Sequence, residues 1–532
     1  MTMKRDLQAF LGRQFDLVVI GGGIQGAAIA RDAALGGLKV ALLEARDFAS
    51  GTSSRSTKLI HGGLRYLEQF ELSLVHEARQ ERRRLMALAP HLAQPLPFLL
   101  PIYRGDPFSP LKIKVGLSVY DLLGNLGAGD RHRMLKPEQA LALMPTLRRD
   151  GLRAAAIYHD SATDDARLTL ENVIDAADHG AVVANYAEVR ALASGRGRVR
   201  AAEVEDALTG RRFEVSGRFF VNAAGPWVDG VRALVAGYDG SRTVRLTKGT
   251  HVVVPPVTGK LALLAAIPDQ DRVFLMWPWH GGAMLGTTDT DFEGDPATVA
   301  PDEGDIRYLL QAANRIFAQP LTEAKVRCPF AGLRALVLES RRDPRNPSAV
   351  TREYRFHEDP WVGNLVSICG GKLTTARALG EKLTQRVAAR LGTTLRGRSS
   401  RVTPLPGGRT GLFESFVRAA AEEAQRDFRL PPAVTERIVR TYGSRWRAVL
   451  EPISAQAELA QPLPYSQDLS EPAPVAAEVV FAAEQEMALK AEDFLLRRSG
   501  LSWTGSLLGG AAPEVGRILT QAGQRNELAT LR

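Results

Sequence analysis

The chain has 532 residues, of which 45% are hydrophobic and 24% are charged, and its net charge is +9. This length predicts two or three domains, and this composition excludes a disordered chain. The only two cysteines, Cys328 and Cys369, argue against a disulfide framework and favour a reducing cytoplasm. The positive charge could attract nucleic acid, but the sequence lacks zinc-finger spacing, a basic arm and aromatic RNA-binding motifs, so no nucleic-acid partner is expected.

The first predicted elements form a nucleotide-binding unit. Residues 15–20, an apolar β-branched run, predict a buried parallel strand, and a second strand is predicted over 39–43, before Glu44. Between them lies a G-x-G-x-x-G motif that opens a helix, and this combination suits a pyrophosphate at the helix N-terminus. Glu44 is placed to accept hydrogen bonds from an adenosine ribose. These elements predict dinucleotide binding but do not separate FAD from NAD.

Three further features favour a flavin. The loop over 47–66 is rich in hydroxyl groups and glycines, which suits the ribityl chain of FAD. Residues 218–222 predict a strand that runs into a turn of small residues, where the backbone can contact the cofactor. Residues 364–369 predict another strand, followed by glycines and a helix whose N-terminus could stabilise a reduced flavin. We therefore expect a cofactor domain assembled from discontinuous pieces.

Several motifs resemble those of the FAD-dependent glycerol-3-phosphate dehydrogenases. The resemblance begins with the loop over 53–67, which contains Lys-Leu-Ile-His-Gly-Gly-Leu-Arg-Tyr-Leu, and the order of the motifs agrees over about 15–390. It implies a fold related to that of D-amino-acid and glycine oxidases, with an added helical C-terminal domain. In one departure, Leu333 and Ala335 flank Arg334 where Val and Pro are expected. The other matching segments are 246–251, 286–289, 332–334 and 370–375, with weaker matches at 440–443 and 478–498.

The expected fold class is α/β. Residues 246–256 and 273–279 predict strands of a second, antiparallel sheet. We predict a Rossmann-type FAD-binding domain from 1–90, 150–245 and 345–390, a substrate domain from 91–149 and 246–344, and a helical C-terminal domain over 391–532.

The C-terminal region is expected to begin with a linker. Residues 392–408, rich in Arg, Thr, Gly and Pro, predict that linker. Farther on, an apolar stripe predicts one helix in which Met487 serves packing rather than chemistry. The stripe consists of Val480, Ala483, Met487, Ala491 and Phe494.

The resemblance implies oxidation of sn-glycerol 3-phosphate to dihydroxyacetone phosphate by hydride transfer to FAD, with the electrons passed to a quinone. The alternatives are a glycerol-3-phosphate oxidase that uses oxygen and a flavin-containing sensor without turnover. The central region lacks a sizeable insertion of the oxidase type, which favours the dehydrogenase. The retained Arg65, His251, Arg334 and Lys372 argue against a sensor.

A phosphorylated polyol requires cations at its phosphate and a proton acceptor at its carbinol. Arginine suits phosphate because its planar fork can donate two bonds at once. The resemblance implies Arg65, Tyr66, Arg334, Arg352 and Lys372 as substrate-binding residues. The expected catalytic residues are His251, Arg334 and Lys372. His251 suits a general base because its reference pKa of about 6.5 lies near neutrality, while Lys372 is its rival and a purely structural histidine stays open.

The residues expected to bind FAD come from the three cofactor segments. His61 is expected to pack beside the isoalloxazine rather than to transfer protons. No metal-ligand cluster, paired carboxylate or Ser-His-Asp order suggests a competing chemistry. The expected cofactor-binding residues are Gly21, Gly23, Ile24, Gln25, Gly26, Glu44, Ala45, Thr52, Ser53, Ser56, Lys58, Leu59, His61, Ala224, Gly225, Lys372, Leu373 and Thr374.

We expect a cytoplasmic protein that lies on the inner face of the cytoplasmic membrane. Its quinone is lipid-soluble, yet the sequence offers neither a secretory signal nor a run of roughly 20 apolar residues. The expected membrane patch is 96–104 followed by 111–115, where Lys112 and Lys114 could meet anionic lipid. The alternative is a core strand and helix of the substrate domain. The sequence leaves the quinone and the oligomeric state open, with a homodimer as one possibility.

Overall fold

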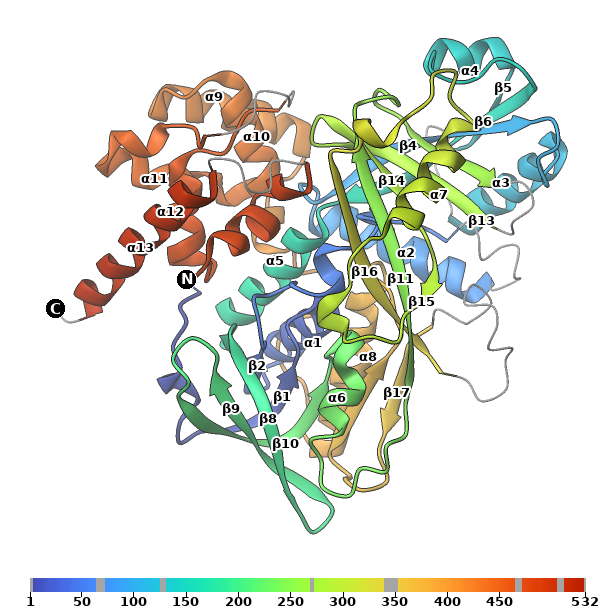
Figure 1. Cartoon of the computed structure of the whole chain (residues 1–532). Helices are drawn as coiled ribbons and strands as arrows, with labels where there is room; N and C mark the ends of the chain where they lie inside the picture. The colour runs from blue at the N-terminus through green and yellow to red at the C-terminus, as the bar shows by residue number, and fades with distance from the viewer. Residues whose placement is uncertain are drawn as a thin grey trace.

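The computed structural model describes residues 3–63, 72–124, 131–267, 272–338, 353–464, 471–504 and 511–530. Within these ranges the strands form one sheet of eight and one of ten. A group of helices from the last quarter of the chain packs beside them, shown in orange and red in Figure 1.

The first sheet is built on parallel strands. β1 (Gln14–Ile20) lies between β2 (Val40–Leu43) and β10 (Arg212–Asn222) and is parallel to both. β10 is also parallel to β18 (Leu365–Cys369), so all three predicted cofactor segments join one sheet. The other strands of this sheet are β7 (Val182–Ala184), β8 (Ala187–Gly195), β9 (Arg198–Asp206) and β17 (Arg355–Glu358), and the helices packed on it are α1 (Ile24–Leu35), α5 (Asp165–Asp178), α6 (Val228–Arg232) and α8 (Ala376–Leu391).

The second sheet is antiparallel except where β12 meets β4. Alternate residues of its strands face two different cores: Val252 and Val254 point to one, and Val253 points to the other. Its strands are β3 (Leu59–Ile60), β4 (Ala93–Tyr103), β5 (Arg133–Leu135), β6 (Leu152–Thr163), β11 (Val244–Val254), β12 (Ala262–Ile267), β13 (Arg272–Trp279), β14 (Gly282–Gly286), β15 (Thr290–Asp291) and β16 (Cys328–Val337). β6 belongs to this sheet although it falls within 150–245, so the boundary between the two sheets lies after β6.

Helices cover both faces of the second sheet. α4 (Pro137–Leu143) and α7 (Glu303–Asn314) supply side chains to the core that contains Val252. α2 (Leu72–Leu88) and α3 (Pro110–Gly124) supply side chains to the opposite core. The short helical segments of the chain are η1 (Gln8–Phe10), η2 (Thr52–Ser54), η5 (Gly225–Trp227), η6 (Pro296–Thr298), η7 (Glu323–Lys325), η9 (Pro406–Gly408), η10 (Gly443–Arg445), η11 (Ala457–Ala460), η12 (Asp493–Arg498) and η13 (Leu501–Thr504).

The C-terminal domain has a core of its own, as predicted for a helical unit. The prediction of a single helix that carries the apolar stripe from Val480 to Phe494 is wrong, because α12 ends at Gln485 and Met487 adopts a left-handed φ of 51°. Met487 is buried in the core of the first sheet, so its expected role in packing is confirmed. The helices of this domain are α9 (Phe413–Phe428), α10 (Pro432–Tyr442), α11 (Trp446–Ala455), α12 (Ala476–Gln485) and α13 (Ala511–Thr530).

The segment predicted as a linker, 392–408, packs against α1 instead of spanning freely. A side chain at Gly397 would place its Cβ 1.7 Å from the carbonyl oxygen of Leu35. The Thr403 carbonyl accepts a 2.6 Å hydrogen bond from Arg31 Nη2. The connection to the C-terminal helices is therefore fixed to α1, on the first sheet.

The first half of the expected membrane patch is a core strand. Phe98 and Leu99 lie in β4, between β6 and β12, and are at most 1% exposed, because their side chains point into the cores on the two faces of the sheet. The second half lies in α3, where Leu111 and Val115 are exposed. Among the described residues, no helix has the length and apolarity needed to cross a bilayer.

Candidate active site

The glycine motif follows β1 and leads directly into α1. Gly21 has a φ of +109°, and a Cβ there would lie 2.7 Å from the Ala223 carbonyl oxygen. A Cβ at Gly26 would lie 1.9 Å from the carbonyl oxygen of Gly21. Gly23 is the N-cap of α1 and brings no side chain of its own to the helix end. The backbone therefore leaves the N-terminus of α1 open to a pyrophosphate, as dinucleotide binding requires.

Glu44 is turned toward this glycine loop. Its carboxylate accepts hydrogen bonds from the backbone N–H of Gly22 at 2.6 Å and of Arg46 at 2.9 Å. Burial raises the pKa of Glu44, while these two bonds oppose the rise. Each carboxylate oxygen keeps a lone pair for a further donor, so the ribose contact stays a prediction. Ala45 beside it is exposed.

The hydroxyl-rich loop is held between both sheets and the start of α1. Ser53 Oγ accepts a 2.9 Å hydrogen bond from the Ile24 N–H. Thr52 Oγ1 donates a 2.6 Å bond to the carbonyl oxygen of Leu333 in β16. This loop thus joins the nucleotide motif to the second sheet, where a ligand that spans both would lie.

Lys58 and Ser56, expected at the cofactor, both bond to Asp165 at the start of α5. Lys58 Nζ lies 2.5 Å from Asp165 Oδ1, and Ser56 Oγ lies 2.6 Å from Asp165 Oδ2. Lys58 is 1% exposed and forms a buried ion pair with Asp165. Leu59 is buried in β3, and His61 follows that strand half-buried. The structure gives Lys58 and Ser56 a part in shaping the loop.

The third cofactor segment lies against the first. Gln25 Nε2 donates a 2.6 Å hydrogen bond to the carbonyl oxygen of Gly370. A Cβ at Gly371 would lie 2.2 Å from Gln25 Nε2, and both glycines have positive φ. Lys372 directly follows these two glycines, so the turn that contains Lys372 lies beside the glycine motif. Leu373 and Ile24 pack against the same apolar cluster, and Thr374 is buried. Ala224 and Gly225 follow β10 at the same end of the sheet.

His251 and Arg334 lie on one face of the second sheet. β11 and β16 pair so that His251 opposes Phe330, Gly249 opposes Gly332, and Thr247 opposes Arg334. Residues two apart in a strand share a face. The two opposed glycines carry no side chain between the histidine and the arginine, and the Arg334 guanidinium lies over Gly249 while the Arg55 carbonyl oxygen lies over Gly332.

His251 is held in an apolar, aromatic setting. Its ring stacks on Phe330 with centroids 5.1 Å apart and meets the edge of Trp277 at 6.2 Å. Its Nε2 lies 3.3 Å from Thr57 Oγ1 in the hydroxyl-rich loop, and Nδ1 finds no hydrogen-bond partner within the described part of the chain. Burial, with the charges of Arg334 and Lys58, lowers the pKa of His251 to about 3. The imidazole is neutral across the physiological range.

Arg334 is oriented by the turn after β14. Its guanidinium donates to Thr287 Oγ1 at 2.9 Å and to the Thr288 carbonyl at 3.2 Å, and it pairs with Asp289 at 3.2 Å. It lies over Gly249, where a Cβ would come within 2.5 Å of Nη2. Leu333 and Ala335 leave β16 regular here, since Ala335 still pairs with Leu246.

Three expected substrate residues, Arg65, Tyr66 and Arg352, lie outside the described residues. Several residues that shape the site were not among the predicted site residues. Gly286 makes room for the histidine, because a Cβ there would lie 2.2 Å from His251 Cδ2. Glycines within apolar strands could have indicated such positions from the sequence. No sequence pattern indicated Phe330 or Thr57.

Comparison with known proteins identifies two matching family models. A model described as FAD dependent oxidoreductase matches residues 16–386, and one described as the C-terminal domain of alpha-glycerophosphate oxidase matches residues 399–527. An aerobic glycerol-3-phosphate dehydrogenase of Staphylococcus haemolyticus is 37% identical over 514 residues, covering 94% of this chain and 88% of that protein. Its counterpart in Staphylococcus aureus is 36% identical over 500 residues, covering 92% and 87%.

Solved structures show the same fold. A glycerol-3-phosphate dehydrogenase from Bacillus halodurans, complexed with FAD, aligns with a TM-score of 0.75 and 30% identity, covering 98% of this chain and 95% of that one. A glycine oxidase from Bacillus cereus aligns with a TM-score of 0.52 at 18% identity, over 72% of this chain and 99% of that one, and supports the fold alone. The predicted fold class and FAD as the cofactor are confirmed.

Proposed function

The chain belongs to the FAD-dependent oxidoreductases, among the relatives of aerobic glycerol-3-phosphate dehydrogenases, and we propose that it oxidises sn-glycerol 3-phosphate to dihydroxyacetone phosphate. The observation that carries this proposal is that His251 and Arg334 share one face of the second sheet, next to the loop that joins both sheets. When bound, FAD accepts the two electrons of the oxidation. The residues of the chain must hold the phosphate and take the hydroxyl proton.

Arg334 is the residue that we assign to the phosphate. Its guanidinium is already fixed by Thr287, Thr288 and Asp289, so little side-chain freedom remains to be lost on binding. A planar fork can donate two parallel bonds to phosphate oxygens. Arg65, Arg352 and Lys372 remain proposed partners in this clamp.

His251 is proposed to receive the hydroxyl proton. Its neutral imidazole is ready to accept, but the charges of Arg334 and Lys58 oppose the imidazolium that would form. A phosphate dianion bound at Arg334 would offset part of this positive charge and raise the pKa of His251. The histidine therefore becomes a stronger base only when substrate is bound. Lys372 is the alternative acceptor.

The enzyme test compares two substrates in one variant. Arg334→Ala should lose most of its activity on glycerol 3-phosphate and little on glycerol, because only the phosphorylated substrate uses the guanidinium. Arg153→Ala, which removes an exposed arginine from β6, is the matched control. Equal proportional losses on both substrates would remove Arg334 from the clamp. Failure of glycerol 3-phosphate to bleach the bound flavin under stopped flow would contradict the dehydrogenase assignment and favour a sensor.

We propose a quinone as the electron acceptor and an anionic membrane surface as the place of reaction. Leu111, Val115, Val119 and Leu122 lie on one side of α3 and are 71%, 56%, 39% and 80% exposed. Their spacing puts them opposite the buried residues of the same helix. Lys112 and Lys114 are exposed on the same turns and could meet anionic headgroups at about 1 kcal/mol per charge.

The membrane proposal is tested by vesicle flotation. The wild type should float with anionic vesicles, and Leu111→Asp combined with Leu122→Asp should remain at the bottom while yellow and folded. Leu412→Asp, at a leucine that is 83% exposed in the C-terminal domain, should float like the wild type. Flotation of the α3 variant would exclude α3 as the anchor. Rapid hydrogen peroxide formation with negligible anaerobic reduction of a soluble quinone would favour the oxidase.

A further inference from the structure

The segment between α12 and η13 leaves the C-terminal domain and enters the cofactor domain. Met487, with its left-handed backbone, buries its side chain in the same core as Leu42 and Val183. Its carbonyl oxygen accepts a 2.9 Å hydrogen bond from Asn185 Nδ2. The C-terminal domain and the cofactor domain are therefore joined here by shared core and by a shared hydrogen bond.

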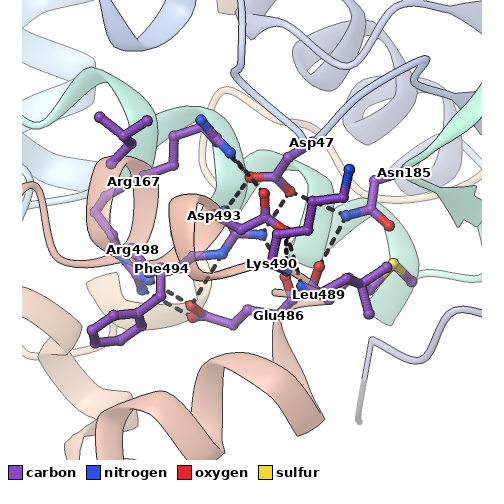
Figure 2. A network of polar contacts seen from close by, with 12 residues as sticks. Asp47, Arg167, Asn185, Glu486, Leu489, Lys490, Asp493, Phe494 and Arg498 are labelled. Atoms are coloured by element: carbon purple, nitrogen blue, oxygen red, sulfur yellow. Dashed lines mark hydrogen bonds and ion pairs between the residues drawn. The ribbon is translucent and has the colours of Figure 1, made fainter. Parts of the chain in front are cut away.

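Asp47 is the residue of the cofactor domain that receives most of this contact. Arg498 donates to both carboxylate oxygens, from Nη1 at 2.8 Å and from Nη2 at 2.9 Å. Arg497 Nε donates at 2.5 Å, and Asn185 Nδ2 donates at 3.1 Å. Asp47 is 1% exposed, so two arginines that lie some 450 residues away hold a carboxylate inside the protein. Figure 2 shows Arg498 and Asn185 converging on it.

The arginines are themselves fixed by other acidic groups. Arg498 Nη2 also donates to the Glu486 carbonyl at 2.7 Å, and the Glu486 carboxylate accepts bonds from both Nη atoms of Arg167 in α5. Arg497 Nη2 donates to Asp493 Oδ1 at 2.7 Å. Burial alone would raise the pKa of Asp47, but Arg498 and Arg497 hold it below its ordinary value. The carboxylate thus stays ionised, and its bonds are charge-assisted.

Asp47 stands in the turn that encloses the glycine loop. Three residues earlier, the Glu44 carboxylate accepts a hydrogen bond from the Gly22 N–H. One residue later, the Phe48 ring packs against Gly22, where a Cβ would lie 2.6 Å from Phe48 Cδ1. The Ala49 N–H donates to the Gly22 carbonyl at 3.1 Å. A shift of Asp47 would move both neighbours away from the backbone that receives the pyrophosphate.

We propose that the C-terminal domain is part of the FAD site, with Arg497 and Arg498 acting as positioning residues that hold the turn around Asp47 closed on the glycine loop. The expected consequence is slow release of FAD. This inference rests on FAD as the cofactor and is independent of the proposed substrate and electron acceptor. It gives the C-terminal domain a role in retaining the cofactor.

The experiment measures FAD release from the holoenzyme without substrate. Asp47→Asn keeps the shape of the side chain but loses its charge, and FAD fluorescence is followed after dilution, well below the unfolding temperature. We expect release to be at least about tenfold faster than in the wild type, in line with the loss of charge-assisted hydrogen bonds.

Glu478→Gln is the matched control. Glu478 is also buried, and its carboxylate accepts hydrogen bonds from both Nη atoms of Arg437. Both residues of this pair lie within the C-terminal domain. The control should lower thermal stability and leave the FAD release rate within about twofold of the wild type. Equal acceleration in both variants would show general loosening and would overturn the proposal, as would an unchanged rate in Asp47→Asn.

A milder variant keeps the test decisive if Asp47→Asn does not fold. Arg497→Gln removes one donor to Asp47 and leaves the Arg498 fork in place. Release, measured well below the melting temperature of the variant, should then be several-fold faster than in the wild type. A rate equal to that of the wild type would overturn the proposal.

Discussion

Gly249→Ala should abolish most activity without damaging the fold. The new Cβ would lie 2.5 Å from Arg334 Nη2 and 2.7 Å from its Cζ, against ordinary contacts of roughly 3.5 Å. The guanidinium must therefore retreat by about 1 Å, and a displacement of this size can cost on the order of 100-fold in rate. The end of a flexible side chain can move at little cost, so the free energy of unfolding should change by less than about 1 kcal/mol.

Gly332→Ala is the contrasting variant on the facing strand. Its Cβ would lie 2.7 Å from the carbonyl oxygen of Arg55, which is backbone and cannot swing aside. We expect a loss of about 1–3 kcal/mol in stability. The assays are kcat/KM on glycerol 3-phosphate and the thermal unfolding midpoint. If Gly249→Ala retained activity within about threefold of the wild type, the position of Arg334 would not matter and the phosphate assignment would be refuted.

Three further predictions concern buried charge. Glu44→Ala should weaken FAD binding by about 1–3 kcal/mol in a fluorescence titration of the apoprotein, and an unchanged Kd would exclude a ribose contact. The pKa of His251 is about 3 in the folded protein and about 6.5 in the unfolded chain, so its contribution to the free energy of unfolding should be complete above pH 6.5. Below pH 6.5 that contribution should fall by up to about 1.4 kcal/mol per pH unit. In urea unfolding, the stability of His251→Gln should therefore depend less steeply on pH than that of the wild type. Lys58→Met should cost about 3–5 kcal/mol by leaving Asp165 buried and unpaired, and adding Asp165→Asn should restore part of the lost thermal stability; a melting temperature equal to that of the wild type would contradict this.

The sequence alone was sufficient for the elements whose signals are local. The glycine motif predicted the turn between β1 and α1 because only glycine accommodates the φ of Gly21 and the contact at Gly26. The two later strand–turn segments also formed as expected, as β10 and β18. Backbone sterics and apolar runs act over a few residues, so they can be recognised without the rest of the chain.

The tertiary structure decided the features that depend on distant partners. Register alone sets Gly249 opposite Gly332, and a shift by one residue would turn His251 and Arg334 to the other face. The apolar run over 96–104 could have been a membrane patch or a strand; pairing with β6 and β12 placed it inside the sheet, and the cores on both faces buried its side chains. The contact between Asp47 and Arg498 joins residues 451 positions apart. Such contacts have no local sequence signal, because burial creates the need for a partner and the fold alone determines which residue meets it.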